Sequence, residues 1–203
     1  MEYRLFEEDT IPYQSTADYH AERDRAPHLE QGTHVGRLNL AAEMVRDAVH
    51  GTRQRGELVP TVVDLGCGDG GLLSLIKDDV GLLSWGYDFT PANAAGWAER
   101  GVQGYAVDVF GADRGSVRLG SVVITTEVLE HLADPHGVVR WIGGSARFIV
   151  ASSPWNENAE SHDACHTWAW DMEGYRALIE QGGFTVVRHE KVGQFQVILG
   201  ERR

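Results

Sequence analysis

The chain has 203 residues and a formal net charge of -12 at pH 7, from 18 Lys and Arg against 30 Asp and Glu. Proteins that bind nucleic acid through its phosphates usually carry a basic face, and no Lys/Arg cluster resembles one here, so tight non-specific binding of nucleic acid is not expected. The length fits one domain, and no run approaches the ~18 apolar residues that a membrane span needs.

Residues 1–32 are polar and irregular, with prolines at positions 12 and 27 as breakers. The first ten, MEYRLFEEDT, lack the apolar core of a signal peptide, and two cysteines do not make a disulfide framework. We therefore expect a cytoplasmic protein. Apolar residues then recur at 35, 38, 42, 45 and 49, which is the spacing of one helix face. Thr33 is expected to cap this helix and Gly51 to end it.

From Leu58 onward, β-branched runs alternate with helical patterns, which predicts a doubly wound, mostly parallel sheet. The last two strands lack room for a crossover helix between them, so they must pair antiparallel. We expect an N-terminal cap segment and helix over 1–57 and the sheet domain over 58–203. The predicted strands are 59–65, 82–88, 102–109, 121–127, 146–153, 184–190 and 193–199, and the helices between them are 71–79, 91–100, 135–144 and 171–183.

The first strand runs into the glycine-rich turn VVDLGCGDGGLL, residues 62–73. Gly66, Gly68 and Gly71 satisfy G-x-G-x-x-G, the pattern of dinucleotide-binding enzymes, whereas Asp64, Gly66 and Gly68 give D-x-G-x-G. Either turn lets a cofactor approach the backbone closely. A lone G-x-G-x-x-G is a weak signal, so the glycines alone do not decide whether the turn binds a dinucleotide or a different cofactor.

Three acids lie at the ends of three successive predicted strands: Asp64, Asp88 and Asp108. The carboxyl ends of parallel strands meet at one edge, where ligands of such sheets bind. Asp64 would repel a pyrophosphate but attract a cationic sulfonium or amino group. Asp88 is placed to accept both hydroxyls of a ribose, and Asp108 to accept from an adenine amino group.

The segments VVDLGCGDGGLL, WGYDFTPAN, AVDVF and VVITTEVLEHLADP resemble successive motifs of class I S-adenosylmethionine-dependent methyltransferases. The resemblance runs from about Leu58 to the C-terminus. It implies an α/β, Rossmann-like, seven-stranded sheet in the order 3-2-1-4-5-7-6, with strand 7 antiparallel, and an N-terminal helical cap. It also implies S-adenosylmethionine as cofactor and S-adenosylhomocysteine as product. The implied cofactor-binding residues are Asp64, Gly66, Cys67, Gly68, Asp69, Gly70, Asp88, Phe89, Asp108, Val109, Thr126 and Glu127.

The segment after the fourth strand, TTEVLEHLADP, should lie near the transferred methyl group. Methyl transfer is an in-line displacement that requires a positioned nucleophile and, for a hydroxyl, removal of its proton. His131 is a candidate base because histidine ordinarily titrates near neutrality; the alternative is a structural histidine. His166, in the loop after the fifth strand, is the second candidate catalytic residue.

Glu127, Glu130 and His131 also spell E-x-x-E-H. Similar residues, with a later histidine, bind a divalent metal in small-RNA 2'-O-methyltransferases, and here His162 or His166 would be that histidine. Related stretches occur in relatives with no known metal. We therefore assign no metal ligand from the sequence, and metal-assisted methylation of an RNA ribose stays an alternative.

The loop over 152–171 leaves the cofactor side of the sheet and carries Trp155, Trp168 and Trp170 beside His162 and His166. Loops this long in a compact domain are usually functional, so we expect a wall of the substrate site, unless the tryptophans fill a small core of their own. His28, Glu30, Gln31 and His34 are expected to supply the opposite wall.

The sequence therefore predicts methyl transfer to an oxygen or nitrogen of a small-molecule substrate, with no membrane partner. An NAD-dependent oxidoreductase is disfavoured by Asp64 and by the lack of a separate substrate domain. A catalytically silent cofactor-binding protein is the remaining alternative. The oligomeric state does not follow from the sequence.

Overall fold

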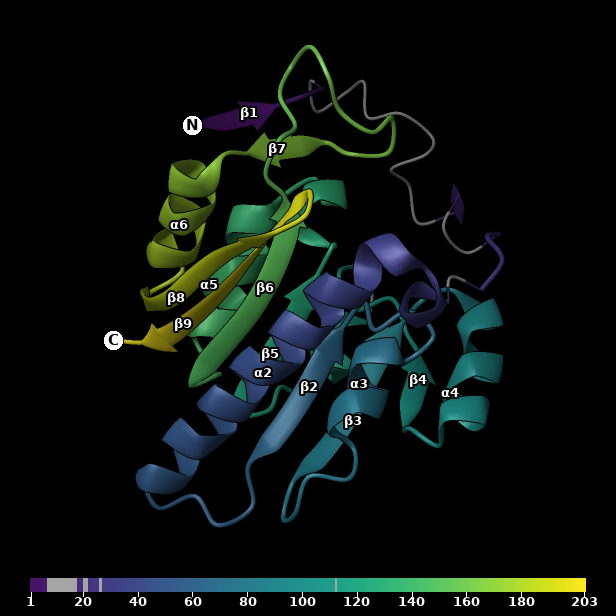
Figure 1. Cartoon of the computed structure of the whole chain (residues 1–203), viewed down its shortest axis with the longest axis vertical. Coiled ribbons are helices and arrows are strands. Elements are labelled where there is room, and N and C mark those ends of the chain that lie inside the picture. The colour runs from purple at the N-terminus through teal and green to yellow at the C-terminus, as the bar shows by residue number, and fades with distance from the viewer. Residues whose placement is uncertain (7–17, 20–21, 26, 112) are drawn as a thin grey trace.

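The computed structural model describes residues 1–6, 18–19, 22–25, 27–111 and 113–203. A seven-stranded sheet forms the centre of the molecule, in the order β4-β3-β2-β5-β6-β9-β8 (Figure 1). The strands are β2 (Thr61–Leu65), β3 (Leu83–Asp88), β4 (Gly104–Ala106), β5 (Val122–Thr126), β6 (Phe148–Pro154), β8 (Phe184–Val192) and β9 (Phe195–Arg202).

The sheet topology confirms the predicted order and directions. The pairs β2–β3, β3–β4, β2–β5 and β5–β6 are parallel, whereas β9 lies antiparallel between β6 and β8. The chain reverses its winding between β2 and β5, so a ligand crevice is expected at the carboxyl ends of these two strands.

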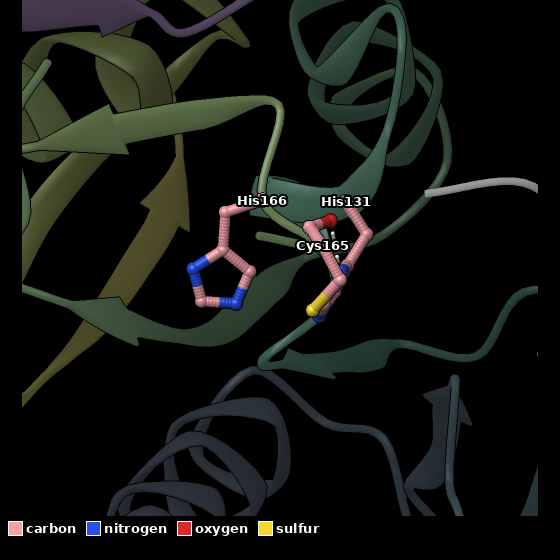
Figure 2. Close-up of side chains that lie close together, drawn as sticks. All are labelled: His131, Cys165 and His166. Atoms are coloured by element: carbon pink, nitrogen blue, oxygen red, sulfur yellow. Dashed lines mark hydrogen bonds between the residues drawn. The ribbon is translucent and has the colours of Figure 1, made fainter. Parts of the chain in front are cut away.

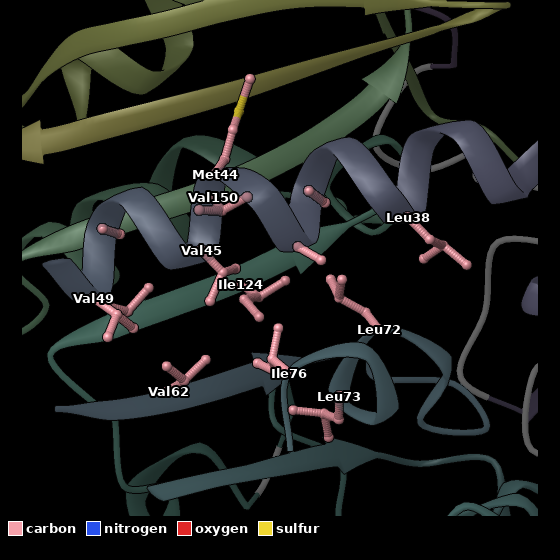
Figure 3. Close-up of a cluster of buried hydrophobic side chains, with 14 of the residues drawn as sticks. Leu38, Met44, Val45, Val49, Val62, Leu72, Leu73, Ile76, Ile124 and Val150 are labelled. Carbon is pink, nitrogen blue, oxygen red and sulfur yellow. The ribbon is translucent and has the colours of Figure 1, made fainter. Parts of the chain in front are cut away.

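Helices cover both faces of the sheet because its central strands are apolar on both sides. On one face, Val62, Ile124 and Val150 pack with α2, α3 and α4 (Figure 3). Residues one position along the strands, such as Val63 and Val123, pack with α5 and α6 on the other face. The helices are α2 (Gly32–Gln54), α3 (Gly71–Ile76), α4 (Ala94–Arg100), α5 (Pro135–Gly143) and α6 (Met172–Gln181), with short 3-10 turns η3 (His28–Glu30), η4 (Pro91–Asn93), η5 (Arg114–Ser116) and η6 (Leu129–His131).

Helix α2 differs from the prediction at both ends. Its N-cap is Gln31, which caps through no side chain, and it continues past Gly51 to Gln54. Gly51 does not end the helix because its role is close packing: a Cβ there would lie 2.7 Å from Cζ of Phe148. The helix shares its hydrophobic core with β2, β5 and β6, and the division of the chain at residue 57 stays a prediction about its organisation.

A second, small sheet lies outside the central one. β1 (Glu2–Arg4) pairs antiparallel with β7 (Trp168–Trp170), and Figure 1 shows the two side by side. The sequence predicted irregular chain at both places. Three-residue strands carry almost no periodic signal, and this pairing joins segments more than 160 positions apart.

Within the described residues, no helix combines the length and the apolar character needed to cross a bilayer.

Candidate active site

A cavity of about 680 Å³ opens at the carboxyl edge of the parallel strands, where the order of the sheet reverses. Four parts of the described chain line it: the strand ends with their glycine loop, the N-terminal segment with the start of α2, the loop between β6 and β7, and the β8–β9 turn at Gln194 and Phe195. This volume lies within the range of cofactor and ligand sites. Of the predicted site residues, those lining it are Asp64, Gly66, Cys67, Gly68, Asp69, Asp88, Phe89, Asp108, Thr126, Glu127, His131 and His166.

The glycine loop joins β2 to α3 and is held against β3. The backbone N–H groups of Gly66 and Cys67 both donate to the carbonyl oxygen of Tyr87, at 2.8 and 3.0 Å. Gly66, Gly68 and Gly70 have φ values of 76°, 53° and 82°, a region that favours glycine. Among the described residues, no atom lies within 4 Å of where a Cβ on Gly68 would be, and Gly68 lines the cavity.

Gly70 does not line the cavity. A Cβ at this position would lie 2.6 Å from Cγ2 of Val102, so here glycine allows the loop to pack on the chain after α4. Gly71, which completes G-x-G-x-x-G, is the first residue of α3 and packs against Leu29.

Two further loop residues face the cavity but have protein partners. Oδ2 of Asp69 accepts from Arg25 (3.2 Å) and Arg100 (2.7 Å), and Oδ1 accepts from the N–H of Gly71. Cys67 packs against Gly86, and burial holds the pKa of its thiol well above the ordinary value. The contacts of both residues therefore stabilise the conformation of the loop.

Asp64 is the acid with unused bonding capacity. It is 1% exposed, and its Oδ1 has no hydrogen-bond partner among the described residues. Burial, followed by the neighbouring charge of Asp88, raises its pKa to about 7, with Arg37 acting in the opposite direction. Buried polar atoms are normally paired, so this oxygen indicates a ligand that donates a hydrogen bond or carries positive charge.

Asp88, at the end of β3, is already well bonded. Oδ2 accepts from the N–H of Gly68 at 2.8 Å, and Oδ1 accepts from the N–H of Thr90 at 2.8 Å and from Asn93 at 3.1 Å. A carboxylate has about four acceptor sites, so these three bonds fix its position and leave room for a further donor. Its predicted ribose contact stays a prediction.

The third acid, Asp108, lies just after β4 and lines the cavity with Phe110. Its Oδ1 accepts from the backbone N–H groups of Phe110 and Gly111. Val109 differs from its neighbours: its side chain is 1% exposed, lies in the hydrophobic core and does not line the cavity. A cofactor contact at Val109 would therefore involve its backbone.

Glu127 follows β5 and is the one non-glycine residue with positive φ in the described chain, at 57°. Such conformations cost energy and cluster at functional sites. Its Oε1 accepts from Oγ of Ser152 at 2.8 Å. Burial raises the pKa of its carboxyl, and nearby Arg37 opposes this shift.

Arg37 is a cavity residue that no sequence motif indicated. It is 1% exposed, lies over the ring of Phe195, and its Nε has no partner among the described residues. Its positive charge acts on both Asp64 and Glu127. The helical spacing contained the signal, since Arg37 falls on the buried face of α2 with Ala41 and Ala48, where an arginine is unexpected.

The two candidate catalytic histidines lie together. The imidazoles of His131, in η6, and His166 meet edge to face with ring centroids 4.7 Å apart. Nδ1 of His131 donates to the carbonyl oxygen of Cys165 at 3.0 Å, and Nδ1 of His166 donates to Oε2 of Glu157 at 2.6 Å. In each ring Nε2 therefore carries the lone pair.

The loop between β6 and β7 divides into two parts. His162 and His166 line the cavity with Glu157 and Asp163, and their role as a substrate wall stays a prediction. The tryptophans do not line it. Lys191 lies over the ring of Trp155, and Trp168 stacks on Trp170 in β7 with centroids 6.0 Å apart, so the aromatic residues serve packing.

The N-terminal segment contributes His28, Gln31 and His34 to the opposite side of the cavity. His28 stacks on His34, and burial lowers the pKa of His28 to about 4. Glu30 does not line the cavity; it pairs with Arg25 and Arg100 instead. Three of the four residues predicted for the opposite wall thus line the cavity, and their contact with a substrate stays a prediction.

The fold and this cavity define the protein's class as a Rossmann-like domain with a cofactor site at the reversal point of its sheet. Residues 37–189 match the protein family described as "Methyltransferase domain". The chain belongs to this methyltransferase family, as its motifs predicted. No curated protein sequence matches the chain.

Solved structures resemble the whole domain at low sequence identity. Magnesium protoporphyrin IX methyltransferase (ChlM) of Synechocystis PCC 6803, with SAM bound, is 15% identical with a TM-score of 0.62, over 99% of this chain and 100% of that one. The N-terminal domain of EvdMO1, in the presence of SAH and D-fucose, is 14% identical with a TM-score of 0.63, over 98% of this chain and 99% of that one. The [4+2]-cyclase SpnF is 13% identical with a TM-score of 0.64, over 89% of this chain and 84% of that one. At these identities the likeness concerns the fold.

Proposed function

We propose that this protein transfers a methyl group from S-adenosylmethionine to an oxygen or nitrogen of a small-molecule substrate. The observation that carries the proposal is the buried Oδ1 of Asp64, which lacks a partner among the described residues and faces a cavity beside an open glycine loop. The ammonium of a methionine moiety would complete its bonding. Membership of the methyltransferase family and the SAM- and SAH-bound structures of similar fold support the same cofactor.

The remaining strand ends fit the other parts of this cofactor. Asp88 retains capacity for a ribose hydroxyl, and Phe89 and Asp108 line the cavity beside it. The cavity then continues past Thr126 and Glu127 to the two histidines. We infer that the adenosine lies toward β3 and β4 and that the methyl group points toward His131 and His166.

At that end, His166 is arranged as a proton acceptor. Its Nδ1–H is held by the carboxylate of Glu157 at 2.6 Å, which fixes the tautomer and leaves Nε2 as the basic atom. A base oriented by an acid in this way suits a nucleophile that must lose a proton, such as a hydroxyl. Small-molecule chemistry is favoured because the net charge is -12, which opposes a polyanionic substrate.

The cofactor is tested by titrating purified protein with S-adenosylmethionine, S-adenosylhomocysteine and NAD in a calorimeter. We expect the first two to bind and NAD to bind at least tenfold more weakly. Preferential binding of NAD would overturn the proposal. Asp88→Asn should weaken S-adenosylmethionine binding while the far-ultraviolet circular dichroism spectrum stays unchanged; unaltered affinity would contradict the ribose contact.

The transfer itself is tested with labelled methyl donor and a cell extract fractionated into nucleic acid, protein and small molecules. We expect label in the small-molecule fraction. Label confined to RNA would instead favour ribose methylation, and cofactor binding without any label would favour a silent binding protein.

A further inference from the structure

Three side chains with donor atoms of metal-ligand type gather at the reacting end of the cavity. The ligating atoms of His131, Cys165 and His166 lie within 4.8 Å of one another. In Figure 2 the sulfur of Cys165 is seen against the ring of His131, and a ring nitrogen of His166 points toward them. His131 and His166 line the cavity itself.

Both imidazoles are oriented in the manner of metal ligands. A histidine that binds a metal nearly always donates its other ring N–H to a carbonyl or carboxylate oxygen, which fixes the ring and its tautomer. Nδ1 of His131 donates to a backbone carbonyl and Nδ1 of His166 to the carboxylate of Glu157. In both rings Nε2 is then the nitrogen with the lone pair.

The backbone holds the three donors in register. Thr167 donates its N–H to the carbonyl oxygen of Glu130 at 2.7 Å. Its Oγ1 contacts the carbonyl oxygens of Glu130 and Leu132, each at 2.9 Å. These contacts tie η6, which carries His131, to the segment that carries Cys165 and His166. Sites on mutually fixed segments keep the geometry that ligation needs.

We propose that His131, Cys165 and His166 form a binding site for a zinc-like divalent metal ion. Two imidazole nitrogens and one sulfur are the donors that zinc prefers, whereas magnesium requires oxygen ligands. Three protein ligands would leave a fourth tetrahedral position for a water or a substrate atom, which is the arrangement of catalytic rather than structural zinc sites. In the metal-free protein the Cys165 thiol donates to Oδ1 of Asp163 at 3.0 Å. On binding, the thiol gives up this bond, loses its proton to solvent and ligates as the thiolate.

This donor set differs from the one that the sequence motif suggested. Glu127 and Glu130 do not belong to the cluster. His162 also lies outside it, with its ring against Phe6. Cys165, which no motif selected, takes part. Zinc–ligand bonds of 2.0–2.3 Å place donors about 3.5 Å apart, so closure from the present spacing requires side-chain movement on the order of 1 Å.

The inference rests on the proposed function only for its role. In the metal-bound protein Nε2 of His166 would ligate the ion and would not act as the base; the ion would instead lower the pKa of a bound hydroxyl, whose proton would leave to solvent. Metal binding can be measured without methyl transfer. The protein is first stripped with a chelator. Zn²⁺ is then titrated in competition with a chromophoric chelator, and Co²⁺ is titrated in parallel while the absorption spectrum is recorded.

We expect one equivalent of Zn²⁺ and a near-ultraviolet thiolate-to-cobalt band. Cys165→Ser should abolish that band, and the chain's other cysteine, Cys67, is buried in the glycine loop. Cys165→Ser and His166→Ala should each weaken Zn²⁺ binding more than tenfold. Glu157→Gln, which removes the partner of His166, should weaken it by about 10- to 100-fold.

His162→Ala is the matched control, since it removes a neighbouring cavity histidine outside the cluster, and it should leave Zn²⁺ affinity within twofold. Circular dichroism verifies that each variant is folded. The proposal would be overturned if the wild type bound no stoichiometric Zn²⁺, or if the Cys165→Ser and His166→Ala variants bound Zn²⁺ as tightly as the wild type. It would also be overturned if His162→Ala lost as much Zn²⁺ affinity as these two variants. None of these results bears on whether S-adenosylmethionine binds.

Discussion

At the scale of single residues, the site depends on acids whose protonation the fold controls. Asp64 combines complete burial with a pKa near 7 and an oxygen that lacks a partner among the described residues. In the ligand-free protein at neutral pH, this acid is therefore divided between its charged and uncharged forms. Only the carboxylate form attracts an ammonium group strongly.

S-Adenosylmethionine affinity should consequently rise between pH 6 and pH 7. The fraction of Asp64 in the charged form grows about fivefold over this interval for a pKa of about 7. The ligand's α-amino group, which titrates at about 7.7–8.0, stays protonated. Calorimetric Kd values across this range provide the measurement.

Asp64→Asn is the control for the pH effect. The variant should bind more weakly, and its affinity should no longer depend on the Asp64 proton. An equal pH dependence in both proteins would show that another group is responsible.

At the scale of elements, caps and close contacts determine where helices begin and end. Asp134 accepts from the N–H of Gly137 at 2.7 Å and caps α5, and Asp171 caps α6 through Gly174 at 2.8 Å. Both caps were predictable, because Asp before a helical pattern is a local signal. The end of α2 was not predictable, because Gly51 packs against Phe148, a residue almost a hundred positions later in the chain.

Asp134→Ala should lower the free energy of unfolding by about 1 kcal/mol, since an N–H at the start of α5 loses its acceptor. For a chain of this size, that corresponds to a Tm lower by about 2–4 °C. Asp134→Asn keeps an acceptor oxygen and should stay close to the wild type in the same thermal unfolding experiment. Equal losses in both variants would assign the effect to charge rather than to the cap.

At the scale of the whole molecule, buried acids make stability depend on pH. Glu130 is fully buried, and neither of its carboxyl oxygens has a partner among the described residues. Burial and the neighbouring charge of Glu127 raise its pKa well above the ordinary value. Because its pKa is higher in the folded than in the unfolded state, protonated Glu130 favours the folded state. This contribution to the free energy of unfolding is complete below about pH 4.5 and is lost as the pH rises toward the folded-state pKa.

Glu130→Gln removes this ionisation. We expect the difference in unfolding free energy, variant minus wild type, to increase with pH above 4.5, by at most about 1.4 kcal/mol per pH unit for one proton. Urea unfolding at several pH values measures it. Glu160→Gln, at an exposed loop position, should show a constant difference; a parallel slope there would remove the assignment to Glu130.

The sequence by itself determined the strands, the mostly parallel sheet with its antiparallel last pair and the three acids, because β-branched runs, glycine turns and connection lengths are local properties. The strand order was expected only from the family resemblance. It also indicated the two histidines, through a motif and a loop. Only the tertiary structure decided which of these groups meet. It placed Arg37 beside Asp64 and Glu127, kept the tryptophans out of the cavity lining, paired β1 with β7 and brought Cys165 together with His131 and His166. The physical reason is that such contacts join segments far apart in the chain, and their geometry is set by packing, which no local pattern records.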